Sequence, residues 1–354
     1  MSKSKGKMKA APAPKKRRAT GAERKARKNV AKHSTILFWF TAILLLGLFL
    51  GRWVTAIANG YTVSFTELDT AASQAVGNMK DLRLTDGERE ELLPLQKEWD
   101  LFSSARLRDE VTMTASDGAE LHGYLYNENA GVTVVVLPRF YQDGTADFLP
   151  AMSLYDLTGC NLLLPDPRMH GLSGGGSFTY GLTEKNDLAD WLAWAEQTLG
   201  PQTFILWGEG TGANTILMAA ADSLLPESVA FVVAESPYAS LHEMAKSSLW
   251  KWYSVPTVPF LGAIELKTAS RAGFRVKDID LPALLADKTP GVPVLFLTSA
   301  GDGYILPAWS EAVEQAYDGP KEFVSGGGNH GTVYAAERDA VDGILAAWWT
   351  EYGA

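Results

Sequence analysis

A glycine-rich segment at residues 204–214 has the spacing of a turn that presents a catalytic side chain. It reads Phe-Ile-Leu-Trp-Gly-Glu-Gly-Thr-Gly-Ala-Asn, a buried strand followed by a sharp turn and the start of an apolar helix. In a Gly-x-Ser-x-Gly turn the central serine stands between strand and helix and attacks a carbonyl carbon. Here Gly208 and Gly212 keep the flanking positions, and Gly210 occupies the centre. Glycine has no side-chain atom that can attack, so the sequence predicts such a turn without its nucleophile.

The segments around this turn alternate between strand-like and helical patterns. The run at 132–137 consists of five β-branched residues and a leucine, as is typical of a strand buried on both faces. Similar runs occur at 161–164, 203–207, 228–233 and 292–297, with helical segments at 146–158, 183–199, 212–222 and 332–350. This alternation predicts an α/β fold with a mostly parallel, doubly wound sheet. Segments 111–115 and 120–126, joined by a Ser-Asp-Gly turn, predict an antiparallel hairpin at its edge.

Four further stretches, in this order and spacing, are similar to those of a known family. The chain from about residue 100 resembles an α/β-hydrolase, and most closely the membrane-anchored bacterial group related to serine aminopeptidases. The matching stretches are the opening hairpin at 116–123, an Asp-x-Arg-x-His-Gly-x-Ser loop at 166–173, the helix start at 180–188, and Glu-Ser-Pro-Tyr at 235–238, which resembles the family's Asp-Ser-Pro-Tyr. The resemblance implies an α/β-hydrolase fold for residues 111–354 and a serine-hydrolase ancestry.

The resemblance also implies a base and an acid. His330, in a Gly-Gly-Gly-Asn-His-Gly loop after the short strand predicted at 322–324, stands where the family has its catalytic histidine. The acid is expected after the strand at 292–297, where Asp302 is the carboxylate. If Pro307 is aligned with the family's downstream proline, however, the position of the family's acid falls on Gly303. We therefore expect a remnant triad of His330 and Asp302, with Gly210 at the nucleophile position.

The oxyanion loop departs from the family pattern. After the strand at 132–137 the family has His-Gly, whereas this chain has Pro138, Arg139 and Phe140. Arg139 lacks the conformational freedom of glycine, and its long side chain can enter the site. Thr211, at the helix start, still supplies one backbone N–H, so Thr211, Arg139 and Phe140 are the expected oxyanion and substrate-binding residues. The five histidines show no close-spaced pair, and we expect neither a metal nor a cofactor.

An insertion at about 241–287 interrupts the alternation of strands and helices. It is rich in aromatic residues and proline, and it follows a strand of the parallel sheet. Ligands of open α/β sheets bind at the carboxyl ends of the strands, so this insertion is expected to form a small lid. Its aromatic residues either pack the lid onto the body or line an apolar pocket, and both roles are compatible.

The first part of the chain has the pattern of a membrane anchor. Residues 1–33 carry nine Lys and four Arg against one acid, whereas the remainder carries 19 basic and 40 acidic residues. An uncharged run at 35–51 and its extension predict a transmembrane helix at 34–58. The positive-inside rule then predicts a disordered, basic cytoplasmic tail at 1–33 and an extracellular C-terminal domain. A cleaved signal peptide ending near Ala56-Ile57-Ala58 is the alternative.

Composition limits the remaining possibilities. The chain has 354 residues, of which 46% are hydrophobic and 21% charged, which is ordinary for a globular protein. Segment 59–110 has polar, helical character, with an apolar stripe of Leu92, Leu95, Trp99 and Phe102, and is predicted to be a stalk or an N-terminal helical layer. The single cysteine, Cys160, excludes an intramolecular disulfide. A basic tail beside an apolar span contacts anionic lipid, and no nucleic-acid partner is expected.

Two functions are compatible with these residues. The first is a membrane-anchored pseudo-hydrolase that binds a small-molecule or peptide ligand, or a partner, without turning it over. The second is an active hydrolase of esters or peptides that uses His330 with a non-standard nucleophile. The absence of a serine at Gly210, the altered oxyanion loop and the displaced acid favour the first, because three departures in one site indicate a lost catalytic demand.

Overall fold

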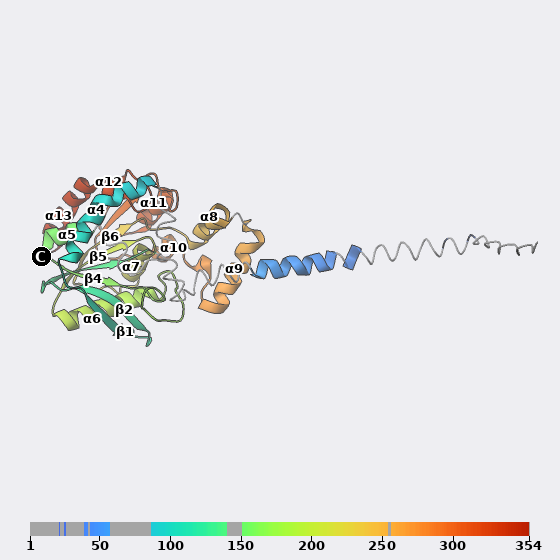
Figure 1. The fold of residues 1–354 in the computed structure, drawn as a ribbon, viewed down its shortest axis with the longest axis horizontal. Coiled ribbons are helices and arrows are strands. Elements are labelled where there is room, and N and C mark those ends of the chain that lie inside the picture. The colour runs from blue at the N-terminus through green and yellow to red at the C-terminus, as the bar shows by residue number, and fades with distance from the viewer. Residues whose placement is uncertain are drawn as a thin grey trace, which may run out of the picture. The chain divides into compact units, whose positions relative to one another are not determined.

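The structure is a computed structural model that describes residues 21, 25, 39–41, 43–56, 86–139, 151–253 and 256–353. The chain divides into two compact units, Met1–Thr55 and Ala56–Ala354 (Figure 1). The division lies close to the end of the predicted transmembrane segment at residue 58.

The described part of the first unit is helical. Helix Trp39–Ala56 is 18 residues long with a mean hydropathy of 1.6, so by length and composition it is able to cross a membrane. A signal sequence meets the same criterion. Of the basic tail, Gly21 and Lys25 are described and both are helical, whereas the composition predicted disorder. The other residues of the tail lie outside the described ranges.

The second unit is built on an eight-stranded sheet with the order β1-β2-β4-β3-β5-β6-β7-β8. β1 and β2 pair antiparallel, as do β2 and β4, and the other neighbours are parallel. The strands are β1 Asp109–Thr114, β2 Glu120–Tyr126, β3 Val132–Leu137, β4 Asn161–Pro165, β5 Thr203–Glu209, β6 Val229–Glu235, β7 Val294–Ser299 and β8 Lys321–Gly326. The mostly parallel sheet with an antiparallel hairpin at its edge is confirmed.

Helices cover both faces of this sheet (Figure 1). One face holds the main apolar core, to which four helices contribute: α4 Asp86–Ser104, α5 Ala151–Thr158, α12 Val333–Ala336 and α13 Arg338–Tyr352. The other face is packed by α7 Thr211–Ala221, which contacts β5 and β6 and lies against α6 Glu184–Leu199. All eleven residues of α7 are buried, because the helix lies between the sheet and its neighbouring helices.

Two segment boundaries differ from the sequence-based prediction. The single helix predicted at 332–350 is two helices, because Glu337 has a non-helical backbone between α12 and α13. β1 begins at Asp109, inside the segment predicted as a stalk. Within that segment, α4 packs Leu95, Trp99 and Phe102 into the core, while residues 59–85 lie outside the described ranges.

The predicted lid region lies between β6 and β7. It contains α8 Leu241–Tyr253, α9 Thr257–Ala272, the 3-10 helix η1 Val276–Asp278 and α10 Leu281–Leu285. His242 Nδ1 of α8 lies 2.9 Å from Glu265 Oε1 of α9, which joins the two helices. Because β6 ends at the carboxyl edge of the parallel strands, the lid helices follow directly from the edge at which α/β sheets bind ligands.

A buried asparagine links three segments at the opposite edge of the sheet. Asn161 Oδ1 accepts the N–H groups of Glu128 and Ala130 at 2.9 and 3.2 Å, and Asn161 Nδ2 donates to the Ala130 carbonyl oxygen at 2.9 Å. Nδ2 also lies within bonding distance of Thr133 Oγ1 and Gln202 Oε1. Asn161 is fully buried, so its amide satisfies its own hydrogen-bonding groups while it ties the 128–130 turn to the start of β4.

Replacing this amide is expected to destabilise the second unit. Asn161→Ala leaves two N–H groups and a carbonyl of the 128–130 turn without their partner, which is expected to lower the free energy of unfolding by roughly 3 kcal/mol. Urea unfolding of the detergent-solubilised chain, followed by tryptophan fluorescence, measures the change. Asn127→Ala is the matched control, because exposed Asn127 accepts only from Asn129 N in the same turn. Equal stability of the two variants would contradict the role given to Asn161.

Candidate functional site

The turn between β5 and α7 has the backbone conformation required to present a residue above the sheet. Gly210 has φ 55° and ψ −107°, in the region that glycine adopts without strain. Its N–H donates to the Glu235 carbonyl oxygen at 2.8 Å, and its own carbonyl accepts from Asn214 N at 3.0 Å. These two bonds attach the turn to β6 and to the first turn of α7.

The flanking glycines are required by close packing. A Cβ atom on Gly212 would overlap the Leu137 carbonyl oxygen at the end of β3, and one on Gly208 would lie 2.5 Å from Ala213 N. Both positions therefore exclude any side chain. The sharp strand–turn–helix geometry is thus built into the sequence even though the central serine is absent.

The central position itself has room for a side chain. A Cβ atom on Gly210 would lie 3.5 Å from Arg139 Cβ and 3.6 Å from Ile305 Cδ1, which are ordinary contact distances. Its positive φ would strain any other residue, at a cost of about 1–3 kcal/mol. Glycine adopts this conformation without that strain, and it offers no side-chain atom that could attack a carbonyl.

The expected base and acid are brought together. His330 Nδ1 lies 2.8 Å from Asp302 Oδ2, while Asp302 Oδ1 accepts the N–H groups of Tyr304 and Ile305 at 2.8 Å each. The Asp302 side chain is fully buried, so these bonds hold its carboxylate in one orientation. The acid that contacts the histidine is thus Asp302, whereas Gly303, the position counted back from Pro307, has no side chain. In the tautomer with the proton on Nδ1, His330 Nε2 is the basic nitrogen.

Tyr304 supports the imidazole from the same loop. Its ring packs edge-on against His330, with 5.0 Å between the ring centroids. The loop after β7 therefore supplies the carboxylate, the backbone donors that orient it, and an aromatic contact for the base. Sequence reasoning did not identify Tyr304, although an aromatic residue two positions after the acid was a visible signal.

The nitrogen that would activate a serine instead faces an ion pair. Arg139 Nη1 lies 2.7 Å from Glu209 Oε1, and His330 Nε2 lies 4.0 Å from the same oxygen. A Cβ atom on Gly331 would lie 2.8 Å from Arg139 Nη1 and 3.0 Å from Glu209 Oε1, so the backbone after His330 packs directly against the pair. The site thus holds a fixed guanidinium and carboxylate beside its base.

Glu209 was not singled out from the sequence. It is the last residue of β5 and its side chain is almost fully buried, which requires a cationic or hydrogen-bonding partner. β3 pairs with β5, so the residues that follow β3 lie beside it, and Arg139 fulfils this requirement. The sequence signal for this ion pair was a carboxylate inside the glycine turn together with an arginine after a neighbouring strand.

The expected oxyanion donors are only partly in place. Thr211 is the first residue of α7 and is buried, so its N–H lies at the positive end of the helix dipole. Arg139 occupies the loop after β3, with its guanidinium held by Glu209. Phe140 lies outside the described residues. The arrangement therefore contains a base, its acid and one predicted donor, but no side chain at the attacking position.

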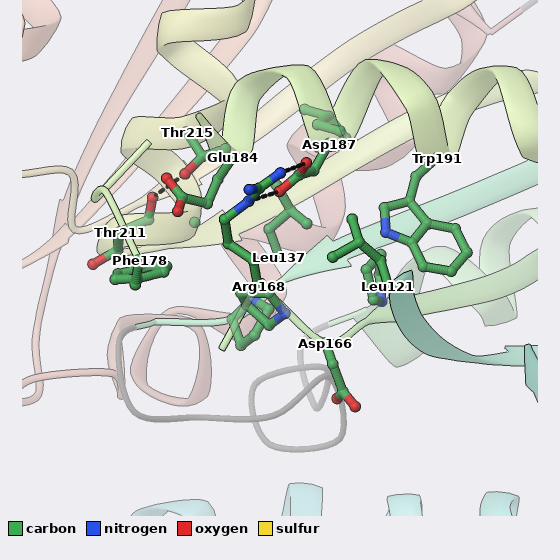
Figure 2. A pocket seen from close by; sticks show the side chains of 15 residues that line it. Leu121, Leu137, Asp166, Arg168, Phe178, Glu184, Asp187, Trp191, Thr211 and Thr215 are labelled. Atoms are coloured by element: carbon green, nitrogen blue, oxygen red, sulfur yellow. Dashed lines mark hydrogen bonds and ion pairs between the residues drawn. The ribbon is translucent and has the colours of Figure 1, made fainter. Parts of the chain in front are cut away.

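A small cavity lies behind this site, between α6, α7 and the ends of β2, β3 and β4 (Figure 2). Its volume is about 30 Å³, which is room for roughly one water molecule. In Figure 2, Arg168 points at Asp187 of α6, and the two form a pair of hydrogen bonds of 2.7 and 2.5 Å. These bonds hold the pKa of Arg168 above its ordinary value. The Arg168–Asp187 pair holds the loop after β4 in place.

A carboxyl group beside the same cavity is also satisfied internally. Glu184 accepts the N–H groups of Thr179 and Gly181 and the Thr179 hydroxyl, each at 2.8 Å. Burial nevertheless raises the pKa of Glu184 above its ordinary value, because it removes the carboxylate from water. With its oxygens engaged by the 179–181 turn, Glu184 orders the start of α6 and takes no part in the site.

Comparison with known proteins agrees with this fold. Residues 143–263 match the family model for the alpha/beta hydrolase fold. A Bacillus subtilis (strain 168) protein, YqkD, itself uncharacterized, is 27% identical over 243 residues, covering 68% of this chain and 79% of the relative.

Solved structures share the architecture at low sequence identity. The esterase Pf2001 of Pyrococcus furiosus has a TM-score of 0.55 and 16% identity, covering 71% of this chain and 95% of its own. Est1E of Butyrivibrio proteoclasticus, solved with ferulic acid, has a TM-score of 0.50 and 16% identity, covering 68% and 98%. The match to the family model over residues 143–263, these structures and the strand order together show that the second unit has an α/β-hydrolase fold.

Proposed function

We propose that this chain is a catalytically impaired hydrolase, anchored in a membrane, whose remnant site binds a ligand or partner without turning it over. The observation that carries the proposal is the turn at Gly210, which keeps the geometry of a nucleophile turn but has no attacking atom. The His330–Asp302 pair remains beside it. A base without a nucleophile supports recognition better than acyl transfer.

The Arg139–Glu209 ion pair is a second obstacle to acyl transfer. In a serine mechanism the base must receive a proton from a hydroxyl group within hydrogen-bonding reach. Here His330 Nε2 faces a carboxylate that is already bound by a guanidinium. The same pair also offers fixed polar groups that fit a ligand with both donor and acceptor atoms, such as a peptide or an amide.

Membrane anchoring is supported by the first unit and by the charge distribution. The helix Trp39–Ala56 is apolar and long enough to span a bilayer. The net charge of +12 in residues 1–33 against −21 in the remainder favours a cytoplasmic N-terminus and a second unit on the outside. The anchor then holds the binding site at the membrane surface.

An active hydrolase is the second candidate, and the intact His330–Asp302 pair favours it. His330 keeps 17% of its side chain exposed, so a water molecule can reach it and be deprotonated. A serine site without its nucleophile keeps roughly 10³–10⁴-fold catalysis over water, from the oxyanion hole and from binding. Thr211 alone offers less than a complete hole, so we expect turnover below that range.

Hydrolysis of short-chain acyl esters and aminoacyl amides separates the two candidates. The detergent-solubilised wild-type chain is expected to hydrolyse them at the same background rate as its His330→Ala variant, because no nucleophile is available for the base to activate. Initial rates at several substrate concentrations measure this. Turnover well above background in the wild type, abolished by His330→Ala, would falsify the impaired-enzyme proposal and support the second candidate.

Restoring the serine tests whether the rest of the machinery survives. Gly210→Ser alone is expected to gain little activity, because Arg139 still occupies the oxyanion loop beside His330. Adding Arg139→Gly is expected to raise kcat by about 10²-fold over Gly210→Ser, the order of magnitude that one oxyanion donor contributes. Reaction with a fluorophosphonate and ester turnover are the two readouts.

The matched control for this experiment is Gly210→Ser/Arg139→Gly/His330→Ala, which retains the hydroxyl but lacks the base. It is expected to lose both fluorophosphonate reaction and turnover. Full activity of Gly210→Ser without a change at Arg139 would show that the ion pair does not obstruct the site. A folded but inert Gly210→Ser/Arg139→Gly variant would show that more than these two positions has been lost.

A further inference from the structure

The lid helix α9 has one buried and one exposed apolar face. Phe260, Ile264 and Thr268 are buried and attach the helix to the body. Pro259, Gly262 and Leu266, at helical spacing on the other side, are exposed. A helix on the surface of a soluble domain normally presents polar residues to water. The outward face of α9 does not follow this rule in its first two turns.

Two of its large apolar side chains are strongly exposed. Val258, at the start of α9, is 82% exposed and Leu266 is 74% exposed, and residues 257–264 contain no charged side chain. An apolar surface of this kind, followed along the helix by polar residues, is typical of an interaction site.

The charge of the lid differs from that of the rest of its unit. Residues 241–285 contain six basic and four acidic residues, whereas the other residues of 56–354 contain 12 basic and 36 acidic residues. Arg271, Arg275 and Lys277, which follow the apolar face, are all exposed. The lid is therefore the region of this acidic unit whose charge complements a negatively charged surface.

The length of chain between the two units limits how far the lid can be from a bilayer. If the helix Trp39–Ala56 spans a membrane, residues 57–85 join its end to α4. Even a fully extended chain of these residues reaches only about 100 Å. The second unit then meets the bilayer surface at high local concentration, and even a weak apolar face with basic neighbours is enough to dock there.

We propose that the outward face of α9 docks on the surface of an anionic lipid bilayer. Val258 and Leu266 enter the boundary between headgroups and acyl chains, and the basic residues at the end of the helix contact lipid phosphates. The proposal rests on the membrane anchoring proposed above and is independent of whether the site catalyses a reaction. It places the remnant site, at the carboxyl edge of the sheet, on the membrane-facing side of the unit.

Site-specific labelling of the full chain in vesicles tests this docking. Cys160 is fully buried and burial raises its pKa to about 11, so an introduced cysteine is the reactive thiol. Leu266→Cys is labelled with bimane and reconstituted into vesicles of phosphatidylcholine and phosphatidylglycerol that contain a lipid spin-labelled on its acyl chain. Because docked helices enter the interface by about 5–10 Å, we expect quenching several-fold above that of the control.

Leu107→Cys is the matched control. Leu107 is 91% exposed and precedes β1. β1 is antiparallel to β2, which is antiparallel to β4, so β1 starts at the amino edge of the parallel strands, opposite the lid. Both variants change an exposed leucine, and neither touches the site.

The outcomes separate docking from anchoring. Vesicle flotation comes first, and a chain that does not float with the vesicles contradicts the anchor itself. In a chain that floats, equal quenching at Leu266→Cys and Leu107→Cys overturns docking and leaves anchoring intact. A different result is a Leu266→Cys label that becomes more shielded from water as the protein-to-lipid ratio rises, without quenching by the lipid. That result assigns the face to a second copy of the chain and also overturns the proposal. Loss of quenching in vesicles of phosphatidylcholine alone supports the charge complementarity.

Discussion

The close approach of α7 to β3 and β5 is the constraint on which the rest of the site depends. At Gly212 there is no space for a Cβ atom beside the Leu137 carbonyl, and at Gly208 none beside Ala213 N. With both glycines in place, the chain turns sharply enough to give Gly210 a positive φ and to start α7 at Thr211. The same approach brings the residue after β3, Arg139, next to the turn. A glycine at the central position is compatible with this packing.

Buried carboxylates at the ends of neighbouring strands explain the electrostatics of the site. A carboxylate removed from water must find donors or a cation. Asp302 accepts hydrogen bonds from two backbone N–H groups and contacts His330, which is the arrangement of a working acid–base pair. Glu209 instead forms an ion pair with Arg139. His330 lies between these two carboxylates. One half of the site is therefore organised as in a hydrolase, and the other half is a structural ion pair.

Apolar and charged residues outside the site are unevenly distributed over the second unit. One apolar cluster of the second unit lies between the sheet and helices such as α13, and the lid also buries apolar residues such as Phe260 and Ile264. The apolar outward face of α9 and the basic residues that follow it lie beyond the carboxyl edge of the sheet, where the lid is inserted. An acidic unit with one basic, apolar face has a preferred orientation at a negatively charged surface, because the remaining surface is repelled.

The sequence alone determined the fold class and the turn at Gly210, because glycine spacing and strand periodicity are local properties. The candidates His330, Asp302, Thr211 and Arg139 came from the resemblance of the sequence to the α/β-hydrolases. Tertiary structure decided which residues meet. Asp302 contacts His330 only because the loop after β7 packs on the loop after β8, and Arg139 pairs with Glu209 only because β3 and β5 are neighbours in the sheet. The break at Glu337 between α12 and α13 also required the fold, since its pattern continues a helix. Pairing across strands depends on the order of the strands in space, and no local pattern in the sequence encodes that order directly.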